Sequence, residues 1–111
     1  MATYKDELTK AMTWLGKQSN IVFMGQSIRY PGTAIFSTLA EVPMNKRIEL
    51  PVFENTQLGL SMGMALTGIT VISIFPRIDF LICAADMLVN HLDKWGEMSH
   101  GEWNPKVIIR T

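Results

Sequence analysis

The segment PVFENTQLGLSMGMALTG, residues 51–68, contains one charged side chain, Glu54, followed by an apolar pattern typical of an α-helix. A helix that is apolar nearly all round is usually covered on every side rather than lying on a wet surface. We therefore expect this helix to be central to the fold. The residues that make it apolar are Leu58, Leu60, Met62, Met64, Ala65 and Leu66.

Glycines occur at regular positions in this helix. Gly59 and Gly63 are four residues apart, so they share one face. Because a glycine inside a helix costs about 1 kcal/mol relative to alanine, two on one face indicate that another backbone packs closely there. Gly68 lies where a left-handed cap would end the helix.

Glu54 is the candidate for chemistry in this segment. It would lie at or just before the first turn, where the helix dipole favours a carboxylate. Apolar surroundings act in the opposite direction and favour the protonated acid. A carboxyl group held between these tendencies can share a proton with a ring nitrogen. The alternative is that Glu54 is an ordinary first-turn acid, which helix capping preferences favour on spacing alone.

Composition excludes some classes of function. The chain has 111 residues, enough for one domain, and its net charge of zero leaves no basic footprint for nucleic acid. It is 48% hydrophobic and only 18% charged, so we expect surplus apolar surface to be covered by a partner subunit.

The single Cys83 excludes an internal disulfide and fits a reducing, cytoplasmic compartment. We expect no secretory signal, because Lys5, Asp6 and Glu7 interrupt the N-terminus.

The uncharged run from Gln57 to Phe75 is close to a membrane span in length. Gly68 followed by the β-branched run Ile69 to Ile72 argues instead for a helix, a turn and a strand. The sequence therefore predicts no membrane span.

Helical and apolar patterns alternate along the chain, which predicts an α/β fold. We expect a three-layer sandwich with a mainly parallel sheet and helices on both faces. Thr3 is the expected N-cap of the first helix, and Cys83 is expected to be buried and inert on the last long one. Helices are predicted over residues 4–18, 33–42, 54–67 and 78–95, and strands over 21–24, 47–50, 69–75 and 106–110. The buried face of the first helix should comprise Leu8, Ala11, Met12 and Leu15, and that of the last Leu81, Ala84, Ala85, Leu88 and Leu92.

The run from Glu54 to Gly68 resembles the pyrimidine-binding domain of thiamine-diphosphate enzymes. It is most similar to the beta subunit of 2-oxo acid dehydrogenases and to the corresponding domain of transketolase. The family pattern is a Glu, four residues, a Gly and a glycine-spaced helix that ends in a Thr-Gly-like turn. The order of further matches supports the resemblance from about Asn20 onward; they are Gly25-Gln26, Asp79-Phe80, Asp86 to Asn90, Lys94 and Val107 to Arg110.

The resemblance implies a function that the chain would perform only with a partner. Glu54 matches the glutamate that hydrogen-bonds the pyrimidine ring of thiamine diphosphate and activates the cofactor, and Phe80 matches the aromatic residue that stacks on that ring. A diphosphate-binding alpha-type subunit or domain would hold the magnesium ion and the phosphates, in a homo- or hetero-oligomer. Without the resemblance, we would expect Phe80 to be an aromatic residue of the hydrophobic core.

Several departures from the family pattern leave alternatives open. Gln26 stands where the family has an acid, and residues 33–46 are shorter than the family's segment. The family's domain continues past the last strand, so residues 1–111 would be a single pyrimidine-binding domain incomplete at its C-terminus: a fragment, a reduced subunit or a degenerate relative. The alternative function is a non-catalytic assembly or regulatory module with the same fold. His91 and His100 lack a second ligand at metal spacing, so we expect no metal site in this chain.

Overall fold

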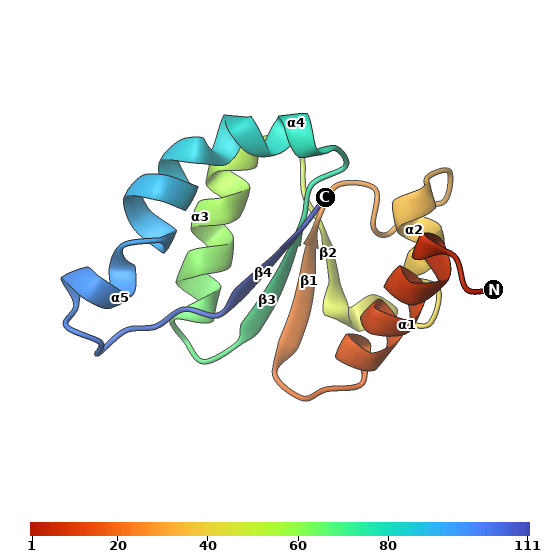
Figure 1. Ribbon diagram of the computed structural model, residues 1–111, viewed down its shortest axis with the longest axis horizontal. Coiled ribbons are helices and arrows are strands. Elements are labelled where there is room, and N and C mark those ends of the chain that lie inside the picture. The colour runs from red at the N-terminus through yellow and green to blue at the C-terminus, as the bar shows by residue number, and fades with distance from the viewer.

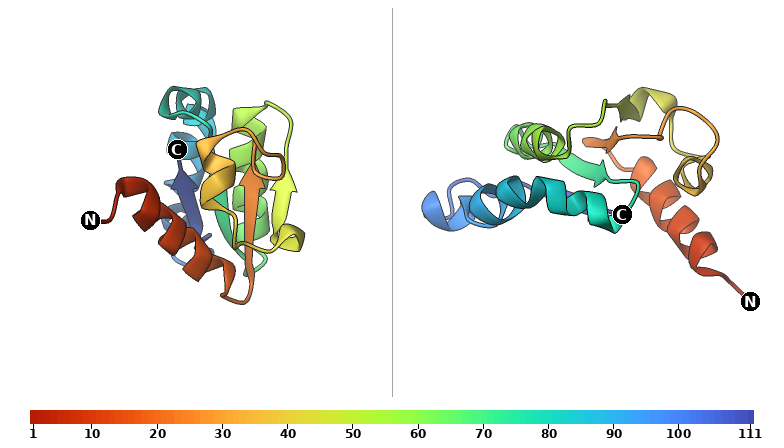
Figure 2. Two further views of the ribbon diagram at one scale, coloured as in Figure 1. Left: turned by 90° about the vertical axis from the view of Figure 1, so that its right-hand side faces the viewer. Right: turned by 90° about the horizontal axis from the view of Figure 1, so that it is seen from above.

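The computed structural model describes residues 1–111 as a parallel sheet between two layers of helices (Figure 1). Figure 2 shows these layers from two further directions. The strands are β1 (Ile21–Gly25), β2 (Arg47–Glu49), β3 (Thr70–Ile74) and β4 (Val107–Arg110). The α-helices are α1 (Tyr4–Gly16), α2 (Ala34–Thr38), α3 (Glu54–Ala65), α4 (Ile78–Leu81) and α5 (Trp95–Met98). Short helices of other types are η1 (Met44–Lys46), η2 (Ile82–Ala84) and η3 (Met87–Leu92).

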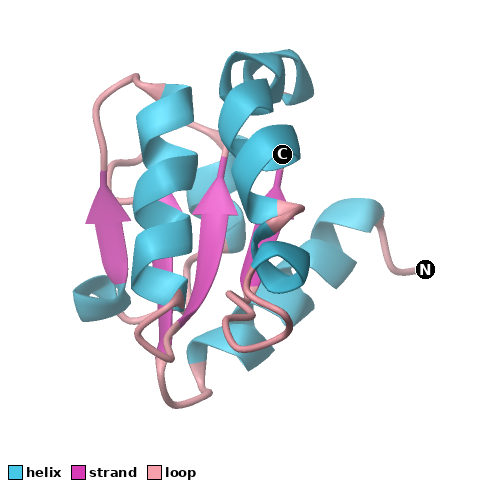
Figure 3. Cartoon of the chain, turned by 90° about the vertical axis from the view of Figure 1, so that its left-hand side faces the viewer, coloured by secondary structure: helices cyan, strands magenta, loops and turns pink.

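The sheet has the strand order β2-β1-β3-β4, and every neighbouring pair is parallel. Figure 3 shows the strands pointing the same way. This confirms the predicted α/β class. The two central strands are mainly apolar because both faces of β1 and β3 are covered by helices.

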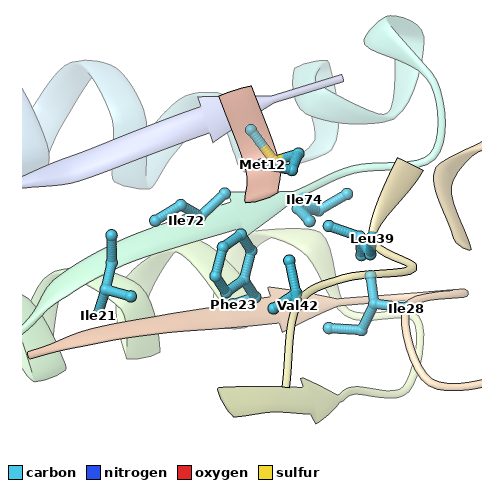
Figure 4. Packing of buried hydrophobic residues seen from close by; sticks show 8 residues of the cluster. All are labelled: Met12, Ile21, Phe23, Ile28, Leu39, Val42, Ile72 and Ile74. Carbon is cyan, nitrogen blue, oxygen red and sulfur yellow. The ribbon is translucent and has the colours of Figure 1, made fainter. Parts of the chain in front are cut away.

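The face of the sheet under α1 and α2 carries the largest apolar cluster. Alternate residues of the central strands point into it, since successive side chains of a strand face opposite ways. Thr3 caps α1 as predicted, because its hydroxyl accepts a hydrogen bond from the Asp6 amide. Ala11 is exposed and was wrongly placed on the buried face. The cluster comprises Met12, Ile21, Phe23, Ile28, Leu39, Val42, Ile72 and Ile74 (Figure 4).

The central helix α3 covers the other face, but the expectation that it is enclosed on every side is wrong for this chain. Leu60 is 44% exposed, and a side chain added at Gly63 would meet no atom within 4 Å. A Cβ at Gly59 would lie 3.1 Å from the methyl carbon of Met87, which is a side chain and not the backbone we expected. Gly68 has a φ of 99°, as its predicted capping role requires.

The predicted helix over residues 78–95 is a helical run that changes type. It passes from α4 through the 3-10 turn η2 to the π-helical η3. The Met87 amide donates to the Asn55 side chain at 3.1 Å, where the π segment begins, so a tertiary contact accompanies the change. Ala84 is buried, but Ala85 and Cys83 are exposed, so the predictions that they are buried are wrong. Leu81, Leu88 and Leu92 pack toward Leu58 and Phe75.

The charged side chain of Arg47 is buried inside the fold at the start of β2. Its guanidinium donates to the carbonyl oxygens of Ile28 (3.0 Å), Val42 (2.6 Å) and Leu39. Desolvation by burial lowers the pKa of Arg47, and the nearby Arg29 charge adds to this. The residue thus ties the α2 segment and the loop after β1 to the edge strand.

None of the helices combines the length and the apolarity that crossing a membrane requires.

Candidate functional site

The candidate site lies at the carboxyl edge of the sheet. The connection that follows β1 leads to α2 on one face, whereas the one that follows β3 leads to α4 on the other. In open α/β sheets ligands bind outside such a switch point, where adjacent connections leave in opposite directions. The loop after β2 opens at this same edge and carries Glu54 into the first turn of α3.

Glu54 is the first residue of α3, as predicted. Its side chain is half-buried, accepts no hydrogen bond from the chain and forms no salt bridge. Glu49, the other acid at this edge, differs in this respect. Its carboxylate accepts hydrogen bonds from the backbone amides of Ser27 (2.9 Å), Ile28 (2.9 Å) and Arg29 (3.1 Å). Glu49 is therefore committed to holding the loop after β1, whereas the Glu54 carboxylate remains available to a ligand.

A buried polar network lies beneath the first turns of α3. The Gln26 side-chain nitrogen donates to Gln57 Oε1 at 2.6 Å, and Gln57 Nε2 donates to Ser73 Oγ at 3.1 Å. Ser61 Oγ donates to the Gln57 carbonyl oxygen at 2.8 Å, which leaves it to accept from Ser73 Oγ at 3.0 Å. Because buried polar groups are costly unless paired, this network fixes α3 on the sheet.

Gly25 ends β1 at the point where the strand meets β3. A Cβ there would lie 2.1 Å from the carbonyl oxygen of Ile74, and the residue has a φ of 154°. Only glycine therefore allows the two central strands to pair up to the edge where Gln26 begins the loop.

Phe80 is on α4 and 36% of it is exposed. The Arg77 guanidinium carbon lies 5.2 Å from the centre of its ring, within the range of a cation–π contact. Arg77 also forms a salt bridge to Asp79 at 2.7 Å. The aromatic side chain is therefore a surface group that already has one cationic neighbour, and not the core aromatic that its residue type alone would suggest.

A hydrogen bond joins α3, which begins with Glu54, to the helical run that carries Phe80 near its start. Asn55, next to Glu54, accepts the hydrogen bond from the Met87 amide, and Met87 belongs to the helical run that begins with α4. Figures 1 and 2 show α4 beside the N-terminal end of α3. Both predicted site residues are thus carried at the same end of the fold.

Sequence reasoning missed Gln57, Ser61 and Ser73 as members of the site's supporting network. A signal was available for Gln57, which is a polar residue one turn after Glu54 where the apolar part of the helix begins. It also missed Arg110 at the carboxyl end of β4. This side chain is 8% exposed, and its Nε and Nη1 atoms are buried without a hydrogen-bond partner. Desolvation lowers its pKa.

Comparison with known proteins bears on this arrangement. No family model matches the sequence. The pyruvate dehydrogenase E1 component subunit beta of Cyanidium caldarium is 27% identical over 99 residues, which cover 86% of this chain. The chain is a distant homologue of that beta subunit. This confirms the resemblance predicted from the sequence. The match covers 30% of the length of the Cyanidium subunit, so the chain spans about a third of its relative.

Proposed function

We propose that this chain is the pyrimidine-binding part of a thiamine-diphosphate-dependent 2-oxo acid dehydrogenase or transketolase-like enzyme. In this proposal Glu54 activates the cofactor, and a diphosphate-binding partner completes the site. The observation that carries the proposal is the Glu54 carboxylate, which is half-buried and unpaired at the ligand-binding edge of the sheet. Homology to a pyruvate dehydrogenase beta subunit supports it.

The residues at this edge fit an aminopyrimidine ring. Glu54 offers an unpaired carboxyl group that can hold a proton against a ring nitrogen, and the N-terminus of α3 stabilises its charge. Phe80 offers an exposed aromatic face, and stacking of this kind contributes about 0.5–1.5 kcal/mol beyond burial. Thiamine diphosphate, when bound, supplies the nucleophilic carbon that attacks a 2-oxo acid or ketose, while the protein orients and polarises it.

The need for a partner is supported by the outer surface of α3 and the helical run beside it. The sequence contains no Gly-Asp-Gly motif of the kind that holds the diphosphate and its magnesium ion in this family, so a second subunit would supply them. Exposed apolar side chains before and on α3 and along the helical run give such a subunit a surface to cover. They are Val52 (77% exposed), Leu60 (44%), Ile78 (69%), Ile82 (74%) and Val89 (51%).

The activity test uses the chain assembled with an alpha-type subunit of a 2-oxo acid dehydrogenase. Oxidative decarboxylation of pyruvate is measured with thiamine diphosphate and magnesium for the unchanged chain, for Glu54→Gln and for Glu97→Gln. Glu97 is an exposed acid on α5 and serves as the matched control. Loss of proton transfer in Glu54→Gln should lower the rate by about a hundredfold or more, with the control unaffected. Full activity of Glu54→Gln would contradict the role assigned to this residue.

A second candidate function is a non-catalytic assembly or regulatory module with the same fold. The observation that favours it is Arg77, whose guanidinium lies over the Phe80 ring and competes with stacking of a cofactor. Gln26, which stands where the resemblance implies an acid, also favours it. The two functions are separated by calorimetry on the assembled complex, because the module would give no heat with saturating thiamine diphosphate and magnesium.

A further inference from the structure

We infer that Gln26 is a positioning residue for Glu54, an inference that rests on the proposed function. Its side-chain nitrogen donates to the carbonyl oxygen of Pro51 at 3.0 Å and to Gln57 Oε1 at 2.6 Å. Pro51 is three residues before Glu54 and Gln57 is three residues after it. One amide group from the loop after β1 therefore holds both flanks of the turn that carries Glu54.

The orientation of both amides follows from their neighbours. Gln57 Nε2 donates to the carbonyl oxygen of Ile74 at 2.9 Å, which is an acceptor only, so Gln57 turns its oxygen toward Gln26. Gln26 in turn faces two acceptors, Pro51 O and Gln57 Oε1, and must present its nitrogen to both. A carboxylate at position 26 has no hydrogen to donate to either atom. Gln26, which stands where the resemblance implies an acid, therefore supplies the donor that the Gln57 side-chain oxygen needs.

The Gln26–Gln57 pair is buried, and this burial makes its hydrogen bonds important for holding the turn that carries Glu54. Gln26 is 7% exposed and Gln57 is fully buried, so water does not replace a lost bond. The Gln57 backbone amide also donates to the Phe53 carbonyl oxygen at 2.8 Å, which closes the helical turn that contains Glu54. Without Gln26, the Pro51 and Gln57 oxygens would be left unpaired, and the turn would be free to open. Gln26 acts through this turn and touches neither Glu54 nor any reacting atom.

Amide hydrogen exchange of the folded chain tests the inference without any cofactor. Gln26→Met keeps a side chain of similar length and removes the donor, whereas Ser61→Ala deletes buried hydrogen bonds of the same network that do not reach Pro51. After correction for global stability, exchange at the Gln57 amide should be about tenfold faster in Gln26→Met than in Ser61→Ala. Equal exchange rates in the two variants would overturn the inference. If Gln26→Met does not fold, the same exchange comparison is made with Gln26→Asn, whose shorter side chain cannot reach both acceptors.

A second arm separates this inference from the proposed function. Thiamine diphosphate with magnesium is titrated into the assembly with the alpha-type subunit, using the unchanged chain and both variants. Binding about tenfold weaker in Gln26→Met than in Ser61→Ala supports the inference. Binding of equal strength in all three overturns it and leaves the proposed function standing. Absence of binding by the unchanged assembly overturns the proposed function, and the exchange comparison then decides on Gln26 alone.

Discussion

Asn55 accepts a hydrogen bond from the backbone amide of Met87 at 3.1 Å and joins the first turn of α3 to the helical run that begins with α4. The bond joins the helix that begins with Glu54 to η3, which belongs to the same helical run as Phe80. It coincides with the start of the π-helical segment η3, and such segments are frequent at functional sites.

We expect Asn55→Ala to destabilise the fold by about 1–2 kcal/mol, because it leaves a partly buried amide without its acceptor. Denaturant unfolding measures the change. Asn90→Ala is the control, since Asn90 bonds Asp86 on the exposed surface of the same run and should cost less than about 0.5 kcal/mol. Equal losses of stability in the two variants would show that the hydrogen bond between α3 and η3 contributes no more than a hydrogen bond on the exposed surface.

Gly63→Ala should stabilise the isolated chain by about 0.5–1 kcal/mol, because the added methyl group meets no atom and removes the backbone entropy cost of a helical glycine. Gly59→Ala should gain less, because its Cβ would press on the Met87 methyl group at 3.1 Å. Thermal unfolding of the two variants side by side measures the difference. A loss of stability in Gly63→Ala at low protein concentration would contradict the open face described for α3.

Arg47→Lys should cost at least about 2 kcal/mol, because an ammonium group cannot reach the three carbonyl oxygens that the guanidinium fork satisfies. The midpoint of chemical unfolding reports this loss. Arg77→Lys, on the exposed surface, is the comparison and should stay within about 0.5 kcal/mol of the unchanged chain. An Arg47→Lys variant as stable as the original would refute the structural role of this residue.

The cap of α1 should make stability depend on pH in the acid range. The pKa of Asp6 is lowered because its carboxylate accepts hydrogen bonds from the Thr3 backbone and hydroxyl, both at 2.8 Å. A carboxyl group with a lowered folded-state pKa stabilises fully above its ordinary value of 3.8 and loses this contribution as pH falls through the lowered one. Unfolding followed from neutral to acid pH should show this loss in the unchanged chain and not in Asp6→Asn. Identical pH dependence in both would exclude the cap as its source.

The positions of the central strands could be predicted because residues 21–24 are a continuous apolar run and residues 69–75 are apolar apart from Thr70 and Ser73, as is typical of parallel sheets with two covered faces. The sequence also placed Glu54 at the start of a helix, since it precedes an uncharged segment with an apolar helical pattern from Leu58 onward. Local patterns were therefore enough to predict the architecture and the position of Glu54 at the start of α3.

What could not be predicted depends on contacts between distant residues. The change of helix type near Met87 accompanies a hydrogen bond from its backbone amide to the Asn55 side chain, and sequence periodicity cannot predict such a tertiary contact. Cys83 was wrongly placed because burial was inferred from the apolar character of the whole helix, whereas only the face with Ala84 packs against the core. The Gln26–Gln57 pair joins residues separated by 31 positions, so neither residue reveals the other in the sequence.

Titration calorimetry of thiamine diphosphate and magnesium into the assembly with an alpha-type subunit tests the central claim most directly. It compares the unchanged chain with Glu54→Gln, and Glu97→Gln is the control. A charge-assisted hydrogen bond from Glu54 to the pyrimidine ring contributes about 1.5–3 kcal/mol, so Glu54→Gln should bind at least about tenfold more weakly while the control binds normally. Equal affinity for the unchanged chain and Glu54→Gln, or no heat from the unchanged assembly, would contradict the account.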